Sequence, residues 1–392
     1  MIYGEKQVKT PIRWGMVGGG RGSSIGYIHR SAALRDFSME LVAGAFDIDP
    51  ERGKDFGRNL LVAEDRCYPD YKAMFAAESE REDGVQAVSI ATPNNTHYEI
   101  SKSALEHGFH VYCEKPLCFT YEQAEELVAL AKEKKRIFAV SYGYAGYQMI
   151  VQGREMIKNG DLGNIRMVHM EFSHGGNTKA SADEVASQKW RTDPTYAGPS
   201  FVLGDLATHP LYLAETMIPD FKIKNLMCYK QAFVKSREPL EDNAYALMNL
   251  EGGAVAHLWC SAVAPASVHG LKIKIIGDEA SISWWAEHPN QLVYEKNGEP
   301  IRLLERGTGY LYDAAKADDR IGAGHNEGLF ESWSNLYRDF AIAVDAAEAG
   351  RDDVDELVKK LHLPTVEFGA EGVKFVEKCV ESAEKGAVWI DY

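Results

Sequence analysis

Two groups of residues in this chain have the types and spacing for redox chemistry. Lys115 stands in Glu114-Lys115-Pro116, about 95 residues beyond a glycine-rich segment near the N-terminus. A glycine-rich loop after a strand can hold the pyrophosphate of a dinucleotide, and a lysine after a later strand can reach the nicotinamide end. Such a lysine can stabilise a developing alkoxide. Loop and lysine together indicate redox chemistry on an alcohol or a carbonyl.

The second group is Asp205 and His209, in the sequence Gly-Asp-Leu-Ala-Thr-His. Residues four positions apart share one face of a helix, so a helix here would place carboxylate and imidazole together. A histidine near a carboxylate is a good general base at neutral pH. The pair is therefore a candidate for accepting the proton of a hydroxyl group.

The glycine-rich segment, residues 17–26, follows a predicted strand and opens a predicted helix. Gly18 and Gly20 fit the first two places of a dinucleotide loop, but Ser23 stands where the third glycine belongs, and Gly26 is expected to take that packing role. The pyrophosphate would bind at the positive end of the helix. The residues expected to contact the cofactor here are Gly18, Gly20, Arg21, Ser23 and Ile25.

Asp47 closes the second predicted strand. A carboxylate at this place can accept both ribose hydroxyls of NAD and repels a 2′-phosphate. No arginine directly adjoins Asp47, although Arg52 is near in sequence. The sequence therefore favours NAD over NADP.

Strands and helices alternate through the first part of the chain. Strands are predicted at 12–18, 41–46, 85–91, 110–113 and 137–141, and helices at 25–34, 51–60, 97–107 and 121–135. This alternation predicts a parallel, doubly wound sheet. Ligands of such sheets bind at the carboxyl ends of the strands. Residues at those ends that we expect to contact the cofactor are Thr92, Pro93, Asn94, His97, Glu114 and Lys115.

The pattern changes near residue 150. Strands are predicted at 166–172, 221–233, 243–250, 254–261, 272–276, 281–284 and 292–294, followed by helices at about 328–349 and 367–384. Few helices interrupt these strands, so a mostly antiparallel sheet is expected. We predict an α/β dinucleotide-binding domain over residues 1–145 and an α+β substrate and oligomerisation domain over 146–392, whose last helices pack back on the first domain.

Composition narrows the function classes. The net charge of −15, from 43 basic and 58 acidic residues, argues against nucleic-acid or anionic-membrane partners. The six cysteines are scattered, which suits a reducing compartment and gives no zinc framework. The first residues lack the apolar region of a secretion signal, and no long apolar segment exists. We expect a cytoplasmic protein without a metal site.

Together these motifs resemble the glucose–fructose oxidoreductase/inositol dehydrogenase family, known as Gfo/Idh/MocA. The segments that carry the resemblance are the glycine loop, Ala91-Thr92-Pro93-Asn94, Glu114-Lys115-Pro116, Gly160-Asp161-Leu162-Gly163 and the Asp205 to His209 element. The resemblance covers almost the whole chain. It implies a Rossmann domain, a large open sheet and oxidoreductase activity on CH–OH groups with NAD as cofactor.

The resemblance also implies roles for three residues. His209 would take the hydroxyl proton while a hydride leaves the same carbon, and Lys115 would hold the alkoxide oxygen. Asp205 would orient the substrate hydroxyl or the lysine. No metal is needed, because the cofactor supplies the hydride chemistry.

The chain departs from the family pattern in its expected substrate contacts. Many members carry an arginine after the strand at 137–141 and an aspartate three residues after the histidine, whereas this chain has tyrosines at 142–147 and Tyr212. Tyr144 could stack on a sugar face, and Trp190 with Arg191 could form a wall and a donor fork. The residues expected to contact substrate are Tyr144, Trp190, Arg191, His209 and His325.

Three functions remain open from the sequence. The first is an NAD-dependent dehydrogenase of a sugar, glycoside, anhydrosugar or cyclitol. The second is a glycoside-cleaving enzyme that retains NAD and works by transient oxidation and elimination, with Tyr144 or Tyr147 as base. The third is a non-catalytic NAD-binding regulator. For all three, the open sheet should leave an apolar face that a second copy covers, which predicts a homodimer or homotetramer.

Overall fold

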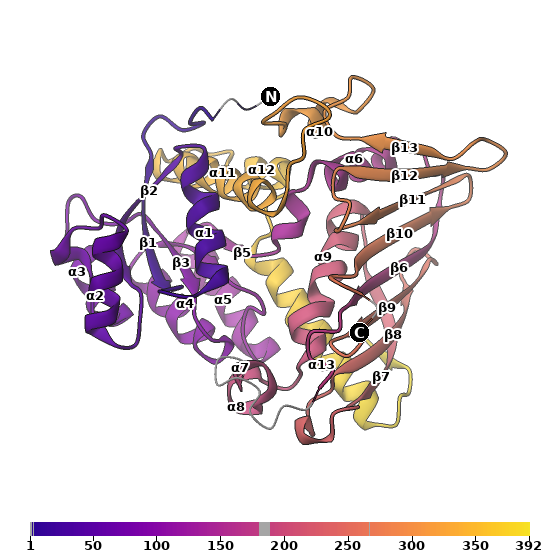
Figure 1. The fold of residues 1–392 in the computed structure, drawn as a ribbon, viewed down its shortest axis with the longest axis horizontal. Helices are drawn as coiled ribbons and strands as arrows, with labels where there is room; N and C mark the ends of the chain where they lie inside the picture. The colour runs from indigo at the N-terminus through magenta and orange to yellow at the C-terminus, as the bar shows by residue number, and fades with distance from the viewer. Residues whose placement is uncertain (1, 3, 180–188, 266) are drawn as a thin grey trace. The chain divides into compact units, whose positions relative to one another are not determined.

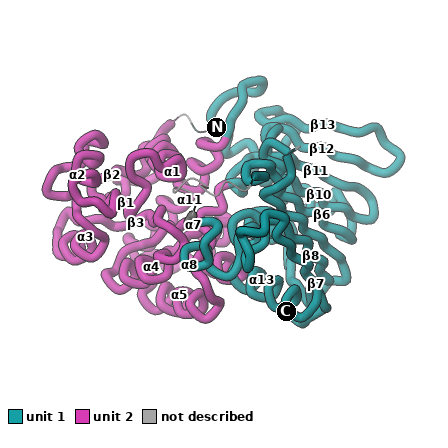
Figure 2. Tube along the Cα trace, turned by 60° about the horizontal axis from the view of Figure 1, so that its bottom comes forward, with its two compact units in different colours: residues 1–3, 144–328, 372–392 teal, residues 4–143, 329–371 magenta. Residues whose placement is uncertain are grey.

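The computed structural model of the protein describes residues 2, 4–179, 189–265 and 267–392. These residues form two compact units, drawn in different colours in Figure 2. The parallel-sheet unit comprises residues 4–143 and 329–371. The large-sheet unit comprises residues 144–328 and 372–392 together with Ile2. The chain therefore returns to its first unit after completing most of the second.

Among its described residues, the parallel-sheet unit contains one five-stranded parallel sheet in the order β2-β1-β3-β4-β5. The strands are β1 (Ile12–Gly18), β2 (Met39–Ala45), β3 (Ala87–Ala91), β4 (His110–Cys113) and β5 (Phe138–Val140). All five strands carry buried apolar side chains, as expected for a sheet covered on both faces. Figure 1 shows the strands and the helices that connect them. The carboxyl ends of β1, β3 and β4 consequently lie side by side at one edge.

Helices connect these strands. They are α1 (Ser24–Arg35), α2 (Pro50–Asn59), α3 (Tyr71–Glu78), α4 (His97–Glu106) and α5 (Tyr121–Lys134), and the unit also contains α11 (Leu329–Glu348) and α12 (Val354–Leu361). The predicted Rossmann architecture is confirmed, but α3 and α12 were not predicted. α3 is one short helix that Asp70 caps by accepting a hydrogen bond from the Ala73 N–H at 2.8 Å. It is too short to show a clear helical period in the sequence.

The large-sheet unit contains, within its described residues, a nine-stranded sheet in the order β13-β12-β11-β10-β6-β9-β8-β7-β14. Its strands are β6 (Ile165–Ser173), β7 (Ile223–Gln231), β8 (Asn243–Leu250), β9 (Val255–Ser261), β10 (Leu271–Gly277), β11 (Ala280–Trp285), β12 (Gln291–Lys296), β13 (Arg302–Glu305) and β14 (Ile390–Asp391). Every neighbouring pair is antiparallel except β6 with β9. The mostly antiparallel sheet is thus confirmed, with β13 and β14 added at its two edges.

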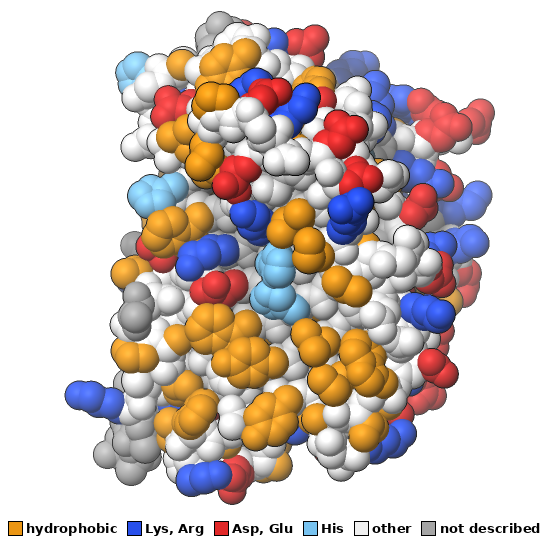
Figure 3. Space-filling model, turned by 90° about the vertical axis from the view of Figure 1, so that its right-hand side faces the viewer, with side chains coloured by type: hydrophobic (Ala, Val, Ile, Leu, Met, Phe, Trp, Pro, Cys, Tyr) orange, Lys and Arg blue, Asp and Glu red, His pale blue; other side chains and the backbone are white. Residues whose placement is uncertain are grey.

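The two faces of this sheet differ. The inner face is apolar and contacts α6 (Gln148–Lys158) and α9 (Thr208–Met217). Shorter helices lie in the connections: α7 (Lys189–Thr192), α8 (Pro194–Ala197) and α10 (Asp313–Ala317). The long helix α13 (Val366–Glu384) begins in residues of the parallel-sheet unit, continues into the large-sheet unit from Gly372 on, and precedes β14. Figure 3 shows the outer face, where exposed hydrophobic side chains gather near charged ones. No described helix is long and apolar enough to cross a membrane.

Candidate functional site

The glycine loop packs tightly against the ends of β1, β2 and β3. Gly18 has φ +76°, and a Cβ on it would lie 2.6 Å from the carbonyl oxygen of Ala91. A Cβ on Gly20 would lie 2.4 Å from the carbonyl oxygen of Phe46. Glycine at these two positions therefore lets the loop fold back over the carboxyl edge of the sheet, which is where a dinucleotide binds in this architecture.

Helix α1 begins directly behind this loop. Ser23 caps it by accepting a hydrogen bond from the N–H of Gly26 at 3.0 Å. A Cβ on Gly26 would come within 2.2 Å of the carbonyl oxygen of Gly19, so Gly26 has the close-packing role expected of the third glycine. Ile25 is half-buried. Arg21 is exposed and forms an ion pair with Asp55 at 2.7 Å.

Asp47 lies just beyond the end of β2 and has an arginine beside it. Arg52 donates from Nη2 to Asp47 Oδ1 at 2.6 Å and from Nε to Oδ2 at 3.2 Å. This hydrogen bonding lowers the pKa of Asp47. No arginine adjoins Asp47 in the sequence, but Arg52 adjoins it in the structure. Helix α2 begins at Pro50, and the first turn of this helix brings the Arg52 side chain next to Asp47 at the end of β2.

His97 connects the two loops that end β3 and β4. Its Nδ1 lies 2.8 Å from the Pro116 carbonyl oxygen and its Nε2 lies 3.0 Å from the Thr92 carbonyl oxygen. The ring is fully buried, and burial lowers the pKa of His97. The predicted cofactor-contacting residues Pro93 and Asn94 lie in the loop that His97 holds, Pro93 exposed and Asn94 buried. His97 was predicted to contact the cofactor, but its buried ring contacts the backbone of these two loops instead.

Glu114 and Lys115 directly follow β4. The Glu114 carboxylate lies 2.9 Å from Nε2 of His29 and accepts a hydrogen bond from the Lys115 backbone N–H at 3.3 Å. Burial raises the pKa of Glu114, but its interactions with His29, Lys115 and Ser141 outweigh burial and lower the pKa to about 2. The carboxylate is therefore ionised beside the half-buried Lys115.

Asp205 and His209 lie in the large-sheet unit. Asp205 is part of a π-helix, Leu203–Ala207, and His209 is the second residue of α9. The predicted helix is therefore confirmed, but its first turn is wider than the α-helix on which their shared face was predicted. Such π turns occur frequently at functional sites. Arg191 Nε donates to Asp205 Oδ2 at 3.0 Å, which joins a predicted substrate residue to a predicted catalytic one.

Aromatic rings surround His209. The ring centroid of Tyr144 lies 4.9 Å from that of His209, and Phe172 of β6 lies 5.9 Å from it. The Tyr144 hydroxyl lies 2.9 Å from His269 Nε2, and Phe172 also packs on His269 at 4.8 Å. Sequence reasoning missed Phe172 and His269, since a buried strand residue and a loop histidine carry no motif.

The remaining predicted substrate residues are His325 and Trp190. His325 is exposed in a loop. Trp190 belongs to α7, but its side chain lies outside the described residues. Tyr147, named as a base, is buried against Trp284 with 5.4 Å between ring centroids, and Tyr212 is buried in α9. Neither tyrosine presents its ring to solvent.

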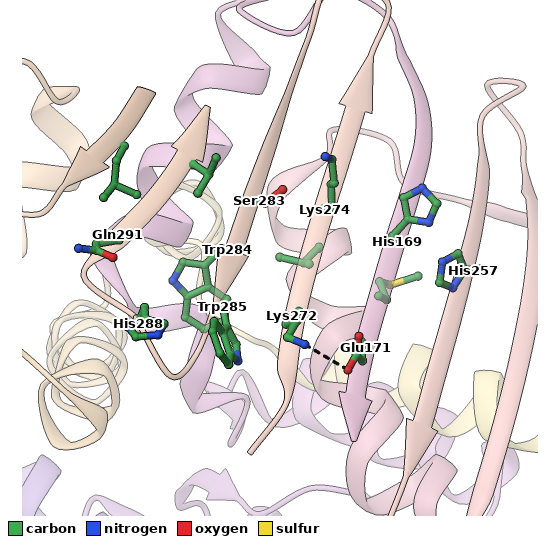
Figure 4. Close-up of a pocket in the computed structure, with 14 residues that line it drawn as sticks. His169, Glu171, His257, Lys272, Lys274, Ser283, Trp284, Trp285, His288 and Gln291 are labelled. Carbon is green, nitrogen blue, oxygen red and sulfur yellow. Dashed lines mark hydrogen bonds and ion pairs between the residues drawn. The ribbon is translucent and has the colours of Figure 1, made fainter. Parts of the chain in front are cut away.

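A pocket of about 480 Å³ lies elsewhere, over the outer face of the large sheet (Figure 4). His169 lies beside His257 there, and Lys272 contacts Glu171 at 3.4 Å. None of the predicted catalytic or substrate residues is among the residues that line it. Across the described part of the chain, no group of three or more His, Cys, Asp or Glu side chains is arranged to hold a metal ion.

Known proteins match this chain over its full length. A family model described as "Oxidoreductase family, NAD-binding Rossmann fold" matches residues 12–142, and one described as "Oxidoreductase family, C-terminal alpha/beta domain" matches residues 154–391. An uncharacterized oxidoreductase of Bacillus subtilis (strain 168), YfiI, is 52% identical, with both chains covered completely.

Solved structures agree with these matches. An inositol dehydrogenase homolog from Azotobacter vinelandii complexed with NAD⁺ is 59% identical, with a TM-score of 0.97 and 100% of both chains covered. A second structure of such a homolog, complexed with NADH and myo-inositol, is 58% identical with a TM-score of 0.95 and the same coverage. The chain belongs to the Gfo/Idh/MocA family of NAD-binding oxidoreductases.

Proposed function

We propose that the protein is an NAD-dependent dehydrogenase that oxidises a secondary ring hydroxyl of a cyclitol, sugar, glycoside or anhydrosugar to the ketone. The observation that carries the proposal is the grouping of Asp205, His209 and Arg191 with the aromatic residues around them. An oxidoreductase needs a base for the hydroxyl proton, and this group supplies one in a polar and aromatic setting that suits a polyol. The similar protein complexed with NADH and myo-inositol supports the choice of substrate class.

The parallel-sheet unit has the residues to hold NAD. The close backbone approaches at Gly18 and Gly20 leave the loop edge open to a pyrophosphate, and the capped N-terminus of α1 carries the positive end of the helix dipole. Asp47 would accept the ribose hydroxyls. Thr92, Pro93, Asn94 and Glu114 would lie along the nicotinamide half, and the bound cofactor would supply the hydride acceptor.

Three side chains would act on the substrate hydroxyl group that is oxidised. His209 would accept the hydroxyl proton, because a neutral imidazole is a good base near pH 7. Lys115 would stabilise the negative charge that develops on the oxygen. Asp205 would orient the reacting groups, and its ion pair with Arg191 would keep its carboxylate in place.

The substrate would contact aromatic and donor groups of the large-sheet unit. Tyr144 and His269, joined by their hydrogen bond, would present a polar edge beside His209. Arg191 would bind a neighbouring hydroxyl while holding Asp205, and His325 would add a further contact. Tyr144 belongs to the segment 142–147, in which this chain has tyrosines and no arginine, whereas many family members carry an arginine there.

NADH formation tests the proposal directly. Purified protein would be incubated with NAD or NADP and a panel of inositols, sugars, glycosides and anhydrosugars, while absorbance reports NADH. We expect turnover with NAD and one substrate class, and a loss of about 10² to 10⁴-fold in kcat for His209→Asn and for Lys115→Met. Absence of turnover with every polyol, or unchanged rates in both variants, would exclude the proposal.

The hydrogen bond between Tyr144 and His269 also favours a second activity. An imidazole beside a phenol can assist removal of the phenolic proton, so Tyr144 could act as the base in an elimination that follows transient oxidation. Tyr147 is a poor candidate, because it is buried against Trp284. Release of an aglycone without net NADH would support elimination, whereas stoichiometric NADH and keto product would support simple oxidation.

We propose that a second copy of the chain covers the outer face of the large sheet. Exposed apolar side chains follow neighbouring strands there, among them Tyr229, Tyr245, Leu247 and Val255. Patches of this kind on folded proteins are usually interfaces. Light scattering should give a dimer or tetramer, and Tyr245→Asp should shift it toward the monomer while Ile48→Asp, on the other unit, should not.

A further inference from the structure

A chain of hydrogen bonds ends at the Glu114 carboxylate. Trp14 Nε1 donates to Ser89 Oγ at 2.8 Å, and Ser89 Oγ lies 2.7 Å from the Tyr337 hydroxyl. The Tyr337 hydroxyl lies 2.6 Å from His29 Nδ1, and His29 Nε2 lies 2.9 Å from Glu114 Oε1. The first four side chains are almost completely buried. We call this series the donor chain.

The two ends of the donor chain set its direction. An indole N–H can only donate, and an ionised carboxylate can only accept. His29 Nε2–H therefore donates to Glu114, and every proton of the series has an acceptor when Ser89 donates to Tyr337 and Tyr337 donates to His29 Nδ1. Burial raises the pKa of Tyr337, so the phenol keeps the proton that it donates.

In this direction every donor proton of the donor chain has one acceptor within hydrogen-bond distance. The reverse direction would leave a hydroxyl proton of Ser89 without an acceptor among these groups in a dry interior, which is unfavourable. The donor chain therefore holds the Glu114 carboxylate in one orientation.

A shorter series reaches the same carboxylate from helix α11. Trp333 Nε1 donates to Ser141 Oγ at 3.2 Å, and Ser141 hydrogen-bonds Glu114. Both series begin with a tryptophan N–H, pass through a serine hydroxyl and end on Glu114. Donor groups from β1, β3, α1 and α11, together with Ser141 after β5, thus hold one negative charge in a fixed place.

That place is the carboxyl edge of the sheet. The backbone N–H of Glu114 donates to the carbonyl oxygen of Ile90 at 3.0 Å. The backbone N–H of Gly19, in the glycine loop, donates to the carbonyl oxygen of Ala91 at 3.0 Å. The ends of β1, β3 and β4 are thereby joined in one row, which begins at the dinucleotide loop and ends at Glu114. The side chain of Glu114 keeps 10% of its surface exposed.

We propose that Glu114 makes the protein bind oxidised dinucleotide more tightly than reduced dinucleotide, and that His29, Ser89, Tyr337 and Ser141 are positioning residues for its charge. The inference rests on the proposed NAD site. The nicotinamide ring is cationic in NAD⁺ and neutral in NADH, so a fixed anion at the nicotinamide end stabilises the oxidised form selectively. Because donors surround the carboxylate before the cofactor arrives, it needs no rearrangement to exert this effect.

Dissociation constants measured without substrate test the proposal. NAD⁺ and NADH would each be titrated into the full-length protein by calorimetry, for wild type, Glu114→Gln, Tyr337→Phe and Ser141→Ala. Glu99→Gln is the matched control, since it removes one exposed acidic charge from the same unit. We expect Glu114→Gln to raise the ratio of the NAD⁺ constant to the NADH constant about tenfold. Tyr337→Phe and Ser141→Ala should raise this ratio about two- to threefold, and Glu99→Gln should leave it unchanged.

The outcomes separate this inference from the proposed function. If Glu114→Gln weakens both cofactors equally, or changes neither, the redox-state selection is wrong while the NAD site stands. If wild-type protein binds neither cofactor, both proposals fail. If Glu114→Gln does not fold, as judged by circular dichroism, Tyr337→Phe and Ser141→Ala decide: an unchanged ratio in both would overturn the inference.

Discussion

Arg52 donates two hydrogen bonds to the Asp47 carboxylate, from Nη2 to Oδ1 at 2.6 Å and from Nε to Oδ2 at 3.2 Å. The pair is asymmetric in exposure, because the arginine side chain is 66% exposed and the aspartate 14%. Asp47 is therefore oriented by Arg52, while Arg52 remains open to other anions. In the proposed NAD site, this pairing would supply a carboxylate for the ribose hydroxyls and a guanidinium for a phosphate next to the end of β2.

Replacing Asp47 should change the cofactor preference. Asp47→Ser would remove the carboxylate that repels a 2′-phosphate and release Arg52 to bind that phosphate. We expect KM for NAD to rise about tenfold and the NADP to NAD ratio of kcat/KM to rise by at least as much. The double variant Asp47→Ser with Arg52→Ala should lose the NADP gain. Equal kinetics with both cofactors in wild type and Asp47→Ser would contradict the assignment.

Removing Arg191 should affect catalysis without affecting cofactor binding. Arg191→Met would leave Asp205 without the ion pair seen at 3.0 Å, so its carboxylate would lose orientation. We expect kcat/KM for the substrate to fall about 10- to 100-fold, with partial recovery in Arg191→Lys. The dissociation constant of NAD should not change. Arg166→Met is a suitable control, because Arg166 is an exposed arginine of β6 in the same unit.

Much of the fold could be predicted because its signals are local. The strands that end at Gly18, Ala91 and Cys113 are apolar segments bounded by turn residues, and their alternation with helices leads to the parallel sheet. The residues after those strands then share one edge by topology alone. The cofactor half of the candidate site followed from this reasoning, including the compensating role of Gly26.

Contacts between distant segments could not be predicted. His29, Glu114 and Tyr337 meet although His29 and Tyr337 are 308 positions apart. Phe172 packs on His209 from a strand, and His269 contacts Tyr144 and Phe172 from a loop, although the sequences of the strand and the loop show only a β pattern and a turn. Arg52 was near Asp47 in sequence, but the first turn of α2 was needed to bring the guanidinium back. Tertiary packing, rather than local propensity, decides each of these contacts.

Adding a methyl group to Gly26 should disrupt the glycine loop. In Gly26→Ala the new Cβ would lie 2.2 Å from the Gly19 carbonyl oxygen, so α1 or the loop must shift. We expect a loss of about 1–3 kcal/mol in the free energy of unfolding, measured by urea denaturation, and a weaker affinity for NAD. Ser24→Ala, at an exposed position of the same helix, should change neither quantity by much. Unchanged NAD affinity in a destabilised Gly26→Ala would show that the loop is not the binding element.

Acidification should destabilise the protein partly through His97. Burial lowers the pKa of His97 in the folded state, whereas in the unfolded chain it returns to about 6.5. Protons then bind the unfolded chain preferentially, so this contribution to stability is intact above pH 6.5 and is lost as the pH falls below it. We expect the free energy of unfolding to decline between pH 6.5 and 5.5, and His97→Gln to reduce that slope by at most about 1.4 kcal/mol per pH unit. His107→Gln, at an exposed histidine of the same unit, should keep the wild-type slope. Identical slopes in wild type and His97→Gln would mean that His97 takes up its proton equally in the folded and unfolded chains, which would contradict the lowered pKa.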